Sequence, residues 1–140
     1  MERKTRQRAA ILRIFQESER ALSPRETHAL AQRLENGIGI ATVYRAVNEL
    51  TAEGFLIPVM LPGKEVRYEA TGRKHHHFFH CDDCDQVYAA PGCMPEVNAL
   101  APDGFEVQRH EVILYGRCAA CKSHQKKNIS TSKSVEKSSH

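Results

Sequence analysis

The residues best suited to chemistry are four cysteines arranged as two CxxC pairs, Cys81-Asp82-Asp83-Cys84 and Cys118-Ala119-Ala120-Cys121. Four thiolates close a tetrahedral zinc site with no open position, which is typical of structural zinc. Residues 85–117 separate the pairs, but the cost of closing a loop grows only slowly with its length. Incidental core thiols and a redox dithiol are the alternatives, and two matched pairs favour a metal. The pattern therefore predicts one structural Zn²⁺ per chain.

A second group of possible ligands lies just before the first pair, in the run His75-His76-His77-Phe78-Phe79-His80. In a strand, His75 and His77 point to one face and His76 to the other. His110 lies inside an apolar segment, where an imidazole needs a partner or a metal. Two or three imidazoles with a carboxylate suit Zn²⁺, Fe²⁺, Mn²⁺ or Ni²⁺. The alternative is a solvated polar strand.

Catalysis has little support in the sequence. There is no nucleophile–base motif, phosphate-binding loop or HExxH. We therefore expect that the protein is not an enzyme. The alternative from a different functional class is a metal-dependent hydrolase or nuclease. The fifth cysteine, Cys93, is interpreted as a small buried hydrophobic residue, with an auxiliary ligand or redox-sensitive thiol as the alternative.

Composition narrows the class of protein. Of 140 residues, 41% are hydrophobic and 26% charged, which is typical of a folded globular chain. No apolar run is long enough to span a membrane, and the N-terminus lacks the apolar core of a secretory signal. We expect a cytoplasmic protein without membrane contact, whose cysteines are thiols or metal ligands rather than disulfides.

The net charge of +3 is unevenly distributed. Residues 1–74 carry 13 Lys or Arg against 9 Asp or Glu, whereas residues 75–121 carry 2 against 7. A basic first half and an acidic second half rich in Cys and His indicate a polyanion-binding module joined to a cation-binding one.

The first half reads as three helices and a hairpin. Thr5 is a possible N-cap of the first helix, Ser23-Pro24-Arg25-Glu26 is a capping box for the second, and the third is expected over residues 40–53. Two short strands follow around Pro62-Gly63, with Pro58 placing the first at an edge. This order is typical of a winged helix-turn-helix, in which Tyr44 and Arg45 on the third helix would face DNA.

The second half predicts a smaller mixed domain. We expect a hinge at residues 71–74, strands over 75–80 and 86–90, a short helix over 94–101 and a long strand over 105–115. Residues 122–140 have little to bury and are expected to form a disordered basic tail. The domains are therefore predicted at 1–70 (DNA binding) and 75–121 (metal binding), within an α+β fold.

Three motifs, in this order, resemble the ferric uptake regulator family of bacterial metal-responsive repressors. They are Gly39-Ile40-Ala41-Thr42-Val43-Tyr44-Arg45, the histidine run that leads into the first CxxC pair, and His110 followed by Leu114-Tyr115-Gly116-Arg117-Cys118. The resemblance covers roughly residues 5–121. It implies an N-terminal winged helix-turn-helix, a hinge, and a small α/β dimerisation domain with structural zinc.

The resemblance also assigns roles to residues. It places structural zinc on the four paired cysteines, a sensory metal site on His75, His77, Glu96 and His110, and a residual hinge site on Glu69 and His76. DNA contact falls on Thr42, Tyr44, Arg45 and the basic first helix, where Arg8 is the candidate.

Two departures from the family pattern bear on the hinge site. Phe78 and Ala21 stand where the family usually has histidines, so the hinge site is two ligands short and a peroxide sensor is disfavoured. Three imidazoles and one carboxylate suit tetrahedral Zn²⁺ better than Fe²⁺, which makes the zinc uptake regulators the candidate branch.

We therefore expect a homodimeric repressor that binds a palindromic duplex operator when loaded with a divalent metal, zinc before iron. The alternative is a zinc-stabilised DNA-binding protein that senses no metal.

Overall fold

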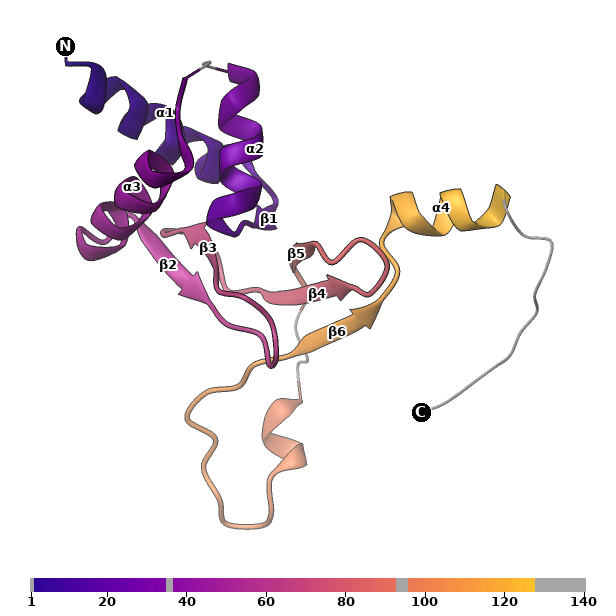
Figure 1. Ribbon diagram of the computed structural model, residues 1–140. Helices are drawn as coiled ribbons and strands as arrows, with labels where there is room; N and C mark the ends of the chain where they lie inside the picture. Colours follow the sequence, from indigo (N-terminus) through magenta and orange to yellow (C-terminus); the bar gives the residue numbers. More distant parts are fainter. Residues whose placement is uncertain (1, 35–36, 93–95, 128–140) are drawn as a thin grey trace.

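Three helices form the N-terminal part of the computed structural model, which describes residues 2–34, 37–92 and 96–127. They are α1 (Arg3–Glu17), α2 (Pro24–Leu34) and α3 (Ile40–Ala52), and they pack against one another (Figure 1). Their apolar stripes meet in one core that includes Ile11, Phe15, Leu22, Ile38, Val43, Val47 and Leu50. Burial of these apolar stripes stabilises helices that would be only marginally stable in isolation.

The starts of two helices were predicted from local sequence, with different outcomes. At α2 the capping box is present, because the Ser23 amide donates to Glu26 Oε1 at 2.9 Å and the Glu26 amide donates to Ser23 Oγ at 3.1 Å. The prediction that Thr5 caps α1 is wrong. The helix begins at Arg3, one turn of backbone hydrogen bonding earlier, with the Arg6 amide bonded to the Glu2 carbonyl.

The wing is a two-stranded antiparallel sheet of β2 (Leu56–Val59) and β3 (Arg67–Ala70), with Leu56 opposite Ala70. Gly54, directly after α3, has φ +87° and Gly63 in the wing turn has φ +73°, so both need the left-handed conformation that glycine tolerates. An isolated bridge between Leu22 and Tyr68 ties β3 to the helical part.

The second sheet joins both halves of the chain. Its order is β1 (Arg20–Ala21), β5 (Val87–Ala90), β4 (His77–Cys81) and β6 (Ile113–Gly116). β4 is antiparallel to β5 and parallel to β6. Because Arg20 pairs with Tyr88, the predicted units 1–70 and 75–121 are linked by strand pairing as well as by residues 71–74.

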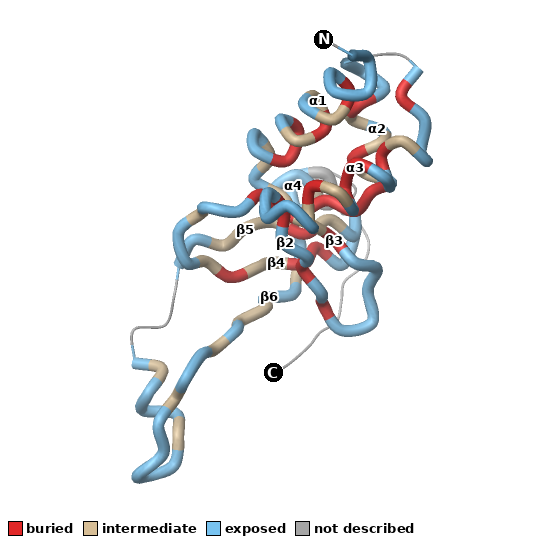
Figure 2. The backbone as a smooth tube through the Cα atoms, turned by 90° about the vertical axis from the view of Figure 1, so that its left-hand side faces the viewer, coloured by how far each residue is buried: buried red, intermediate tan, exposed pale blue. Residues whose placement is uncertain are grey.

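The segment between β5 and β6 corrects one prediction. The expected long strand over 105–115 is wrong: only Ile113–Gly116 is a strand, since β4 is short and offers partners only from Phe78 to Cys81. The expected helix over 94–101 is reduced to a 3₁₀ turn, η1 (Val97–Leu100), and residues 93–95, with Cys93, lie outside the described residues. This segment extends away from the sheet (Figure 1), and none of residues 96–112 is buried (Figure 2).

The expected tail also needs a correction. Helix α4 (Ala119–Lys127) continues from the second CxxC pair into residues expected to be disordered. The first turn of this helix contains the second CxxC pair, and there the Lys122 amide donates to the Cys118 carbonyl at 2.9 Å. Residues 128–140 lie outside the described residues. Among the described helices, none is long and apolar enough to cross a membrane.

Candidate metal centres and nucleic-acid interface

The four paired cysteines meet at one end of the second sheet. Their sulfur atoms all lie within 4.8 Å of one another, and Sγ of Cys84 is 3.9 Å from Sγ of Cys118. Parallel pairing of Cys81 with Gly116 brings the second pair beside the first, which explains how residues 85–117 can separate two halves of one site. Four convergent thiols fit Zn²⁺ in a closed tetrahedral site.

Cys81 is the most enclosed of these ligands, with 0% of its surface exposed. Burial alone would raise the pKa of its thiol, but the amides of Cys84 and Cys118 donate to its sulfur, and the pKa falls to about 6. By contrast, burial and the neighbouring sulfurs raise the pKa of Cys121 to about 12. Cys81 is therefore ionised at neutral pH, whereas Cys121 needs a nearby cation to become a thiolate.

Three histidines form a second cluster next to the hinge. The ligand nitrogens of His75, His77 and His110 all lie within 4.8 Å of one another. His77 begins β4, whereas His75 lies in a bend just before it, and their Nε2 atoms are 3.1 Å apart. The pairing of β4 with β6 brings His110 beside them. The His77–His110 ring centroids are 4.9 Å apart. Three imidazoles fit a borderline divalent cation such as Zn²⁺.

His77 is 5% exposed. Burial, followed by repulsion from His75 and His110, lowers its pKa, so the ring is neutral at physiological pH. Its Nδ1 accepts a hydrogen bond from the Val112 amide at 3.2 Å. In a neutral ring Nε2 then carries the proton and donates to Nε2 of His75 at 3.1 Å. A metal bound through either nitrogen of His77 competes with one of these hydrogen bonds.

The fourth predicted member of that cluster, Glu96, is not brought to it. Among the described residues, its carboxylate is not one of the ligand atoms that converge there, and Glu96 is exposed at the start of η1. The reason is the outward course of residues 96–112. Glu111, which sequence reasoning missed, lies closer and lines the same cleft as the three histidines; its position next to His110 was the available signal.

The residual hinge site consists of one pair. His76 Nε2 lies 2.8 Å from Glu69 Oε1, and His76 Nδ1 donates to the Lys74 carbonyl at 2.7 Å. The Phe78 ring packs edge-on against His76 at 5.1 Å, occupying the side where the family pattern would place another imidazole. Within the described residues no third ligand joins this pair.

A cleft of about 410 Å³ connects the histidine cluster with the DNA-binding half. It is lined on one side by Pro58, Val59, Met60 and Leu61 of the wing, and on the other by the three clustered histidines, His76 and Glu111. The wing and the clustered imidazoles therefore face a common cleft.

Three of the predicted DNA-contacting residues lie on α3, and the fourth, Arg8, lies on α1. Tyr44 is 46% exposed, and Thr42 and Arg45 line a cleft of about 430 Å³ together with Arg3, Lys4 and Arg8 of α1. Arg8 differs from Arg45 because its guanidinium pairs with Glu53 and lies 4.0 Å from Glu49. Arg8 therefore also ties α1 to α3, and its contact with DNA stays a prediction. Within the described residues, Arg45 makes a long hydrogen bond of 3.4 Å to Thr42 Oγ1.

Comparison with known proteins agrees with this layout. The sequence model described as the ferric uptake regulator family matches residues 2–115. A ferric uptake regulation protein from Cupriavidus metallidurans is 32% identical over 115 residues, covering 79% of this chain and 80% of that protein.

Two solved structures are also similar. A zinc-bound manganese uptake regulator has a TM-score of 0.72 at 28% identity and covers 84% of this chain and 91% of its own. The ferric uptake regulator of Francisella tularensis with iron has a TM-score of 0.63 at 26% identity, with coverages of 83% and 91%.

Proposed function

Because the chain belongs to the ferric uptake regulator family, we propose that it is a zinc-responsive repressor that binds a palindromic duplex operator as a homodimer. Members of this family are metal-responsive transcriptional regulators, so the chain is a regulator and not an enzyme. Its place of action would be the cytoplasm, where the DNA lies.

The observation that carries this proposal is the cleft shared by the wing and the histidine cluster. His75, His77 and His110 would hold the regulatory ion, which neutralises repulsion among ligands and fixes three rings at one point. A metal changes DNA binding only if it has different affinities for two arrangements of the protein. The shared cleft supports this idea, because residues of the wing and the histidine ligands both line it.

Zinc is favoured by the donor set. Three imidazoles converge, and among the described residues no carboxylate oxygen lies within the same 4.8 Å group. Fe²⁺ and Mn²⁺ prefer more oxygen ligands and higher coordination, whereas Zn²⁺ accepts nitrogen-rich tetrahedral sites. The related structures hold zinc in one case and iron in the other, so relationship alone does not select the metal.

The operator and the dimer are inferred from surfaces. Tyr44, Arg45 and Thr42 would enter the major groove on α3, with the Arg3 and Lys4 side of the cleft towards phosphate. β6 lies at the edge of the second sheet, and its Leu114 and Tyr115 are about half exposed, at 49% and 52%. An exposed apolar edge favours pairing with a second copy, and two-fold symmetry would match a palindromic site.

An operator-binding titration with buffered free Zn²⁺, Fe²⁺ and Mn²⁺ tests this function on wild type, His77→Ala and the control His28→Ala. His28 lies on α2, away from the cluster. We expect activation by Zn²⁺ at the lowest concentration, loss of the response in His77→Ala and a normal response in His28→Ala. Activation only by Fe²⁺ would make the metal assignment wrong. Strong binding by every variant without added metal would favour a DNA-binding protein that senses none.

A further inference from the structure

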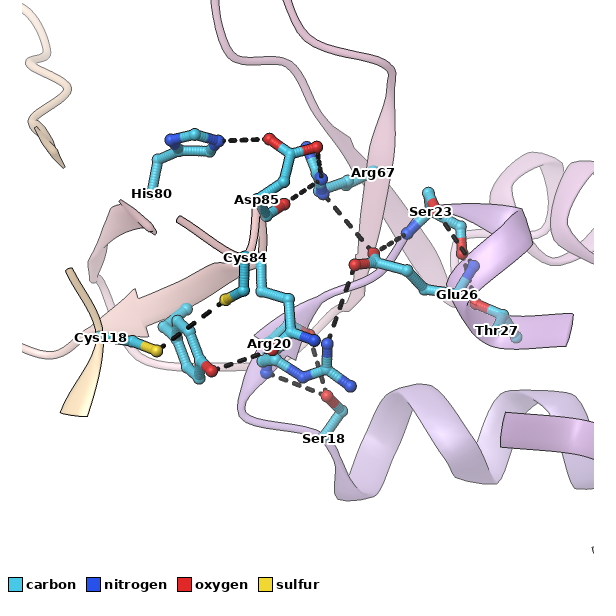
Figure 3. Close-up of polar contacts among 12 residues, drawn as sticks. Ser18, Arg20, Ser23, Glu26, Thr27, Arg67, His80, Cys84, Asp85 and Cys118 are labelled. Atoms are coloured by element: carbon cyan, nitrogen blue, oxygen red, sulfur yellow. Dashed lines mark hydrogen bonds and ion pairs between the residues drawn. The ribbon is translucent and has the colours of Figure 1, made fainter. Parts of the chain in front are cut away.

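A buried guanidinium lies between the two halves of the molecule. Arg67 of β3 is 1% exposed. Its Nη2 donates to the backbone carbonyl of Asp85 at 2.6 Å and lies 3.5 Å from Asp85 Oδ2, while its Nε lies 3.6 Å from Glu26 Oε1 (Figure 3). Sequence reasoning did not single out this residue, because a lone arginine in a short strand carries no signal of its own.

The two partners of Arg67 belong to different parts of the fold. Glu26 lies in the first turn of α2, where it also closes the capping box with Ser23. Asp85 directly follows the first CxxC pair and has φ +62°, and its amide donates to the Cys81 carbonyl at 2.8 Å. Arg67 thus connects the second helix of the DNA-binding half to the turn that carries Cys84.

The side chain of Asp85 also contacts two residues other than Arg67. His80, 1% exposed, lies with Nε2 2.7 Å from Asp85 Oδ1, and Lys64 of the wing turn lies 3.7 Å from the same oxygen. The chain of contacts therefore runs from α2 through Glu26, Arg67 and Asp85 to a buried side chain of β4 (Figure 3).

Packing alone does not account for an arginine here. A buried charge is costly without partners, and an apolar side chain of similar volume would fill the space at lower cost. Nε and Nη1 of Arg67 have no hydrogen-bond partner within the described residues, so the guanidinium is not fully satisfied. The guanidinium instead contacts two elements at once, through a hydrogen bond from Nη2 to the Asp85 carbonyl and an ion pair of Nε with Glu26.

We propose that Arg67 is a positioning residue that locks the winged helix in one orientation against the turn of the first CxxC pair. This rests on the proposed function, because the orientation matters only if both recognition helices of a dimer must meet one face of DNA. The pairing of β1 with β5 joins the two halves, and Val59 and Leu61 of the wing pack with Val87 of β5 in a small apolar cluster across the same junction. Apolar packing has no fixed direction, whereas the contacts of Arg67 with Asp85 and Glu26 define one orientation across that junction.

The test compares Arg67→Met with Arg20→Met as the matched control. Arg20 also faces Glu26, at 3.8 Å, but within residues 2–34, 37–92 and 96–127 it forms no hydrogen bond or ion pair with Asp85. Its pairing with β5 uses the backbone. Residual dipolar couplings of the zinc-loaded full chain report the relative orientation of the two halves. In wild type and Arg20→Met we expect one alignment tensor for both halves. In Arg67→Met we expect two different tensors, with the zinc content unchanged.

Operator affinity is the second measurement. A loss of about tenfold or more in Arg67→Met, with Arg20→Met within about twofold of wild type, is expected for a lost orientation. Arg67→Lys keeps the charge but not the planar fork, so only partial recovery is expected. If Arg67→Met does not fold, Arg67→Gln, which keeps a polar end but is too short to reach both Glu26 and Asp85, replaces it and should also give two tensors.

A single tensor in the zinc-loaded variants overturns the proposal. The failure of the proposed function looks different, because wild type would then show one tensor but bind no operator.

Discussion

Arg45 is the residue whose removal should separate DNA binding from folding most cleanly. It is exposed on α3 and lines the cleft between α1 and α3. Its hydrogen bond to Thr42 is long, at 3.4 Å. Replacement at such a surface position usually changes the free energy of unfolding by no more than about 0.5 kcal/mol. We therefore expect Arg45→Ala to keep its melting temperature and its zinc.

The loss of operator affinity can be bounded. One bidentate contact from arginine to a guanine is worth about 1–3 kcal/mol. A dimer carries two copies of α3, so Arg45→Ala should cost about 2–6 kcal/mol, or roughly 30-fold to 10⁴-fold in Kd. If Arg45 contacts phosphates instead, the slope of log K against log salt should also become shallower by about 1.8 for two contacts.

The assay is fluorescence anisotropy with a duplex selected by the wild-type protein from a random library, at several salt concentrations. Arg33→Ala is the matched control, since Arg33 is exposed in the last turn of α2 and lines a separate groove with Ile14 and Glu17. Unchanged affinity in Arg45→Ala would refute the placement of α3 in the groove. An equal loss of operator affinity in Arg33→Ala would mean that the effect comes from the lower net charge and not from the position of Arg45.

Three further predictions concern the second sheet. Cys81→Ser should remove the bound zinc, measured by elemental analysis, and with it on the order of 10 kcal/mol of folding free energy; a zinc-free but fully folded wild type would contradict this. Metal binding through Nε2 of His77 should move the ring proton to Nδ1, so that Nδ1 no longer accepts from the Val112 amide. Changed imidazole ¹⁵N chemical shifts and faster hydrogen exchange of the Val112 amide would report this change. An unchanged tautomer would exclude ligation through Nε2. Gly116→Ala should lower the melting temperature by an amount equivalent to about 1–3 kcal/mol, because its Cβ would lie 3.2 Å from the Phe79 ring; an unchanged value would mean that the ring yields.

Much of the fold and of the candidate sites could be predicted from local patterns in the sequence. Residues a few positions apart determine the capping box of α2, the apolar stripe of α3 and the wing around Gly63. The closeness of His75 to His77 is equally local. Spacing of this kind reflects the periods of helix and strand, so it is readable without a structure. The matched CxxC pairs are equally local, and chemistry alone assigns their metal class.

Long-range pairing decided the rest. The register of β4 with β6 put Cys118 beside Cys81 and His110 beside His77, and it also ended the strand that residues 105–115 had suggested. Pairing of β1 with β5 and the contacts of Arg67 then joined two halves that the sequence describes as separate. Each of these results depends on which distant backbone groups find partners, and no pattern of neighbouring residues contains that information.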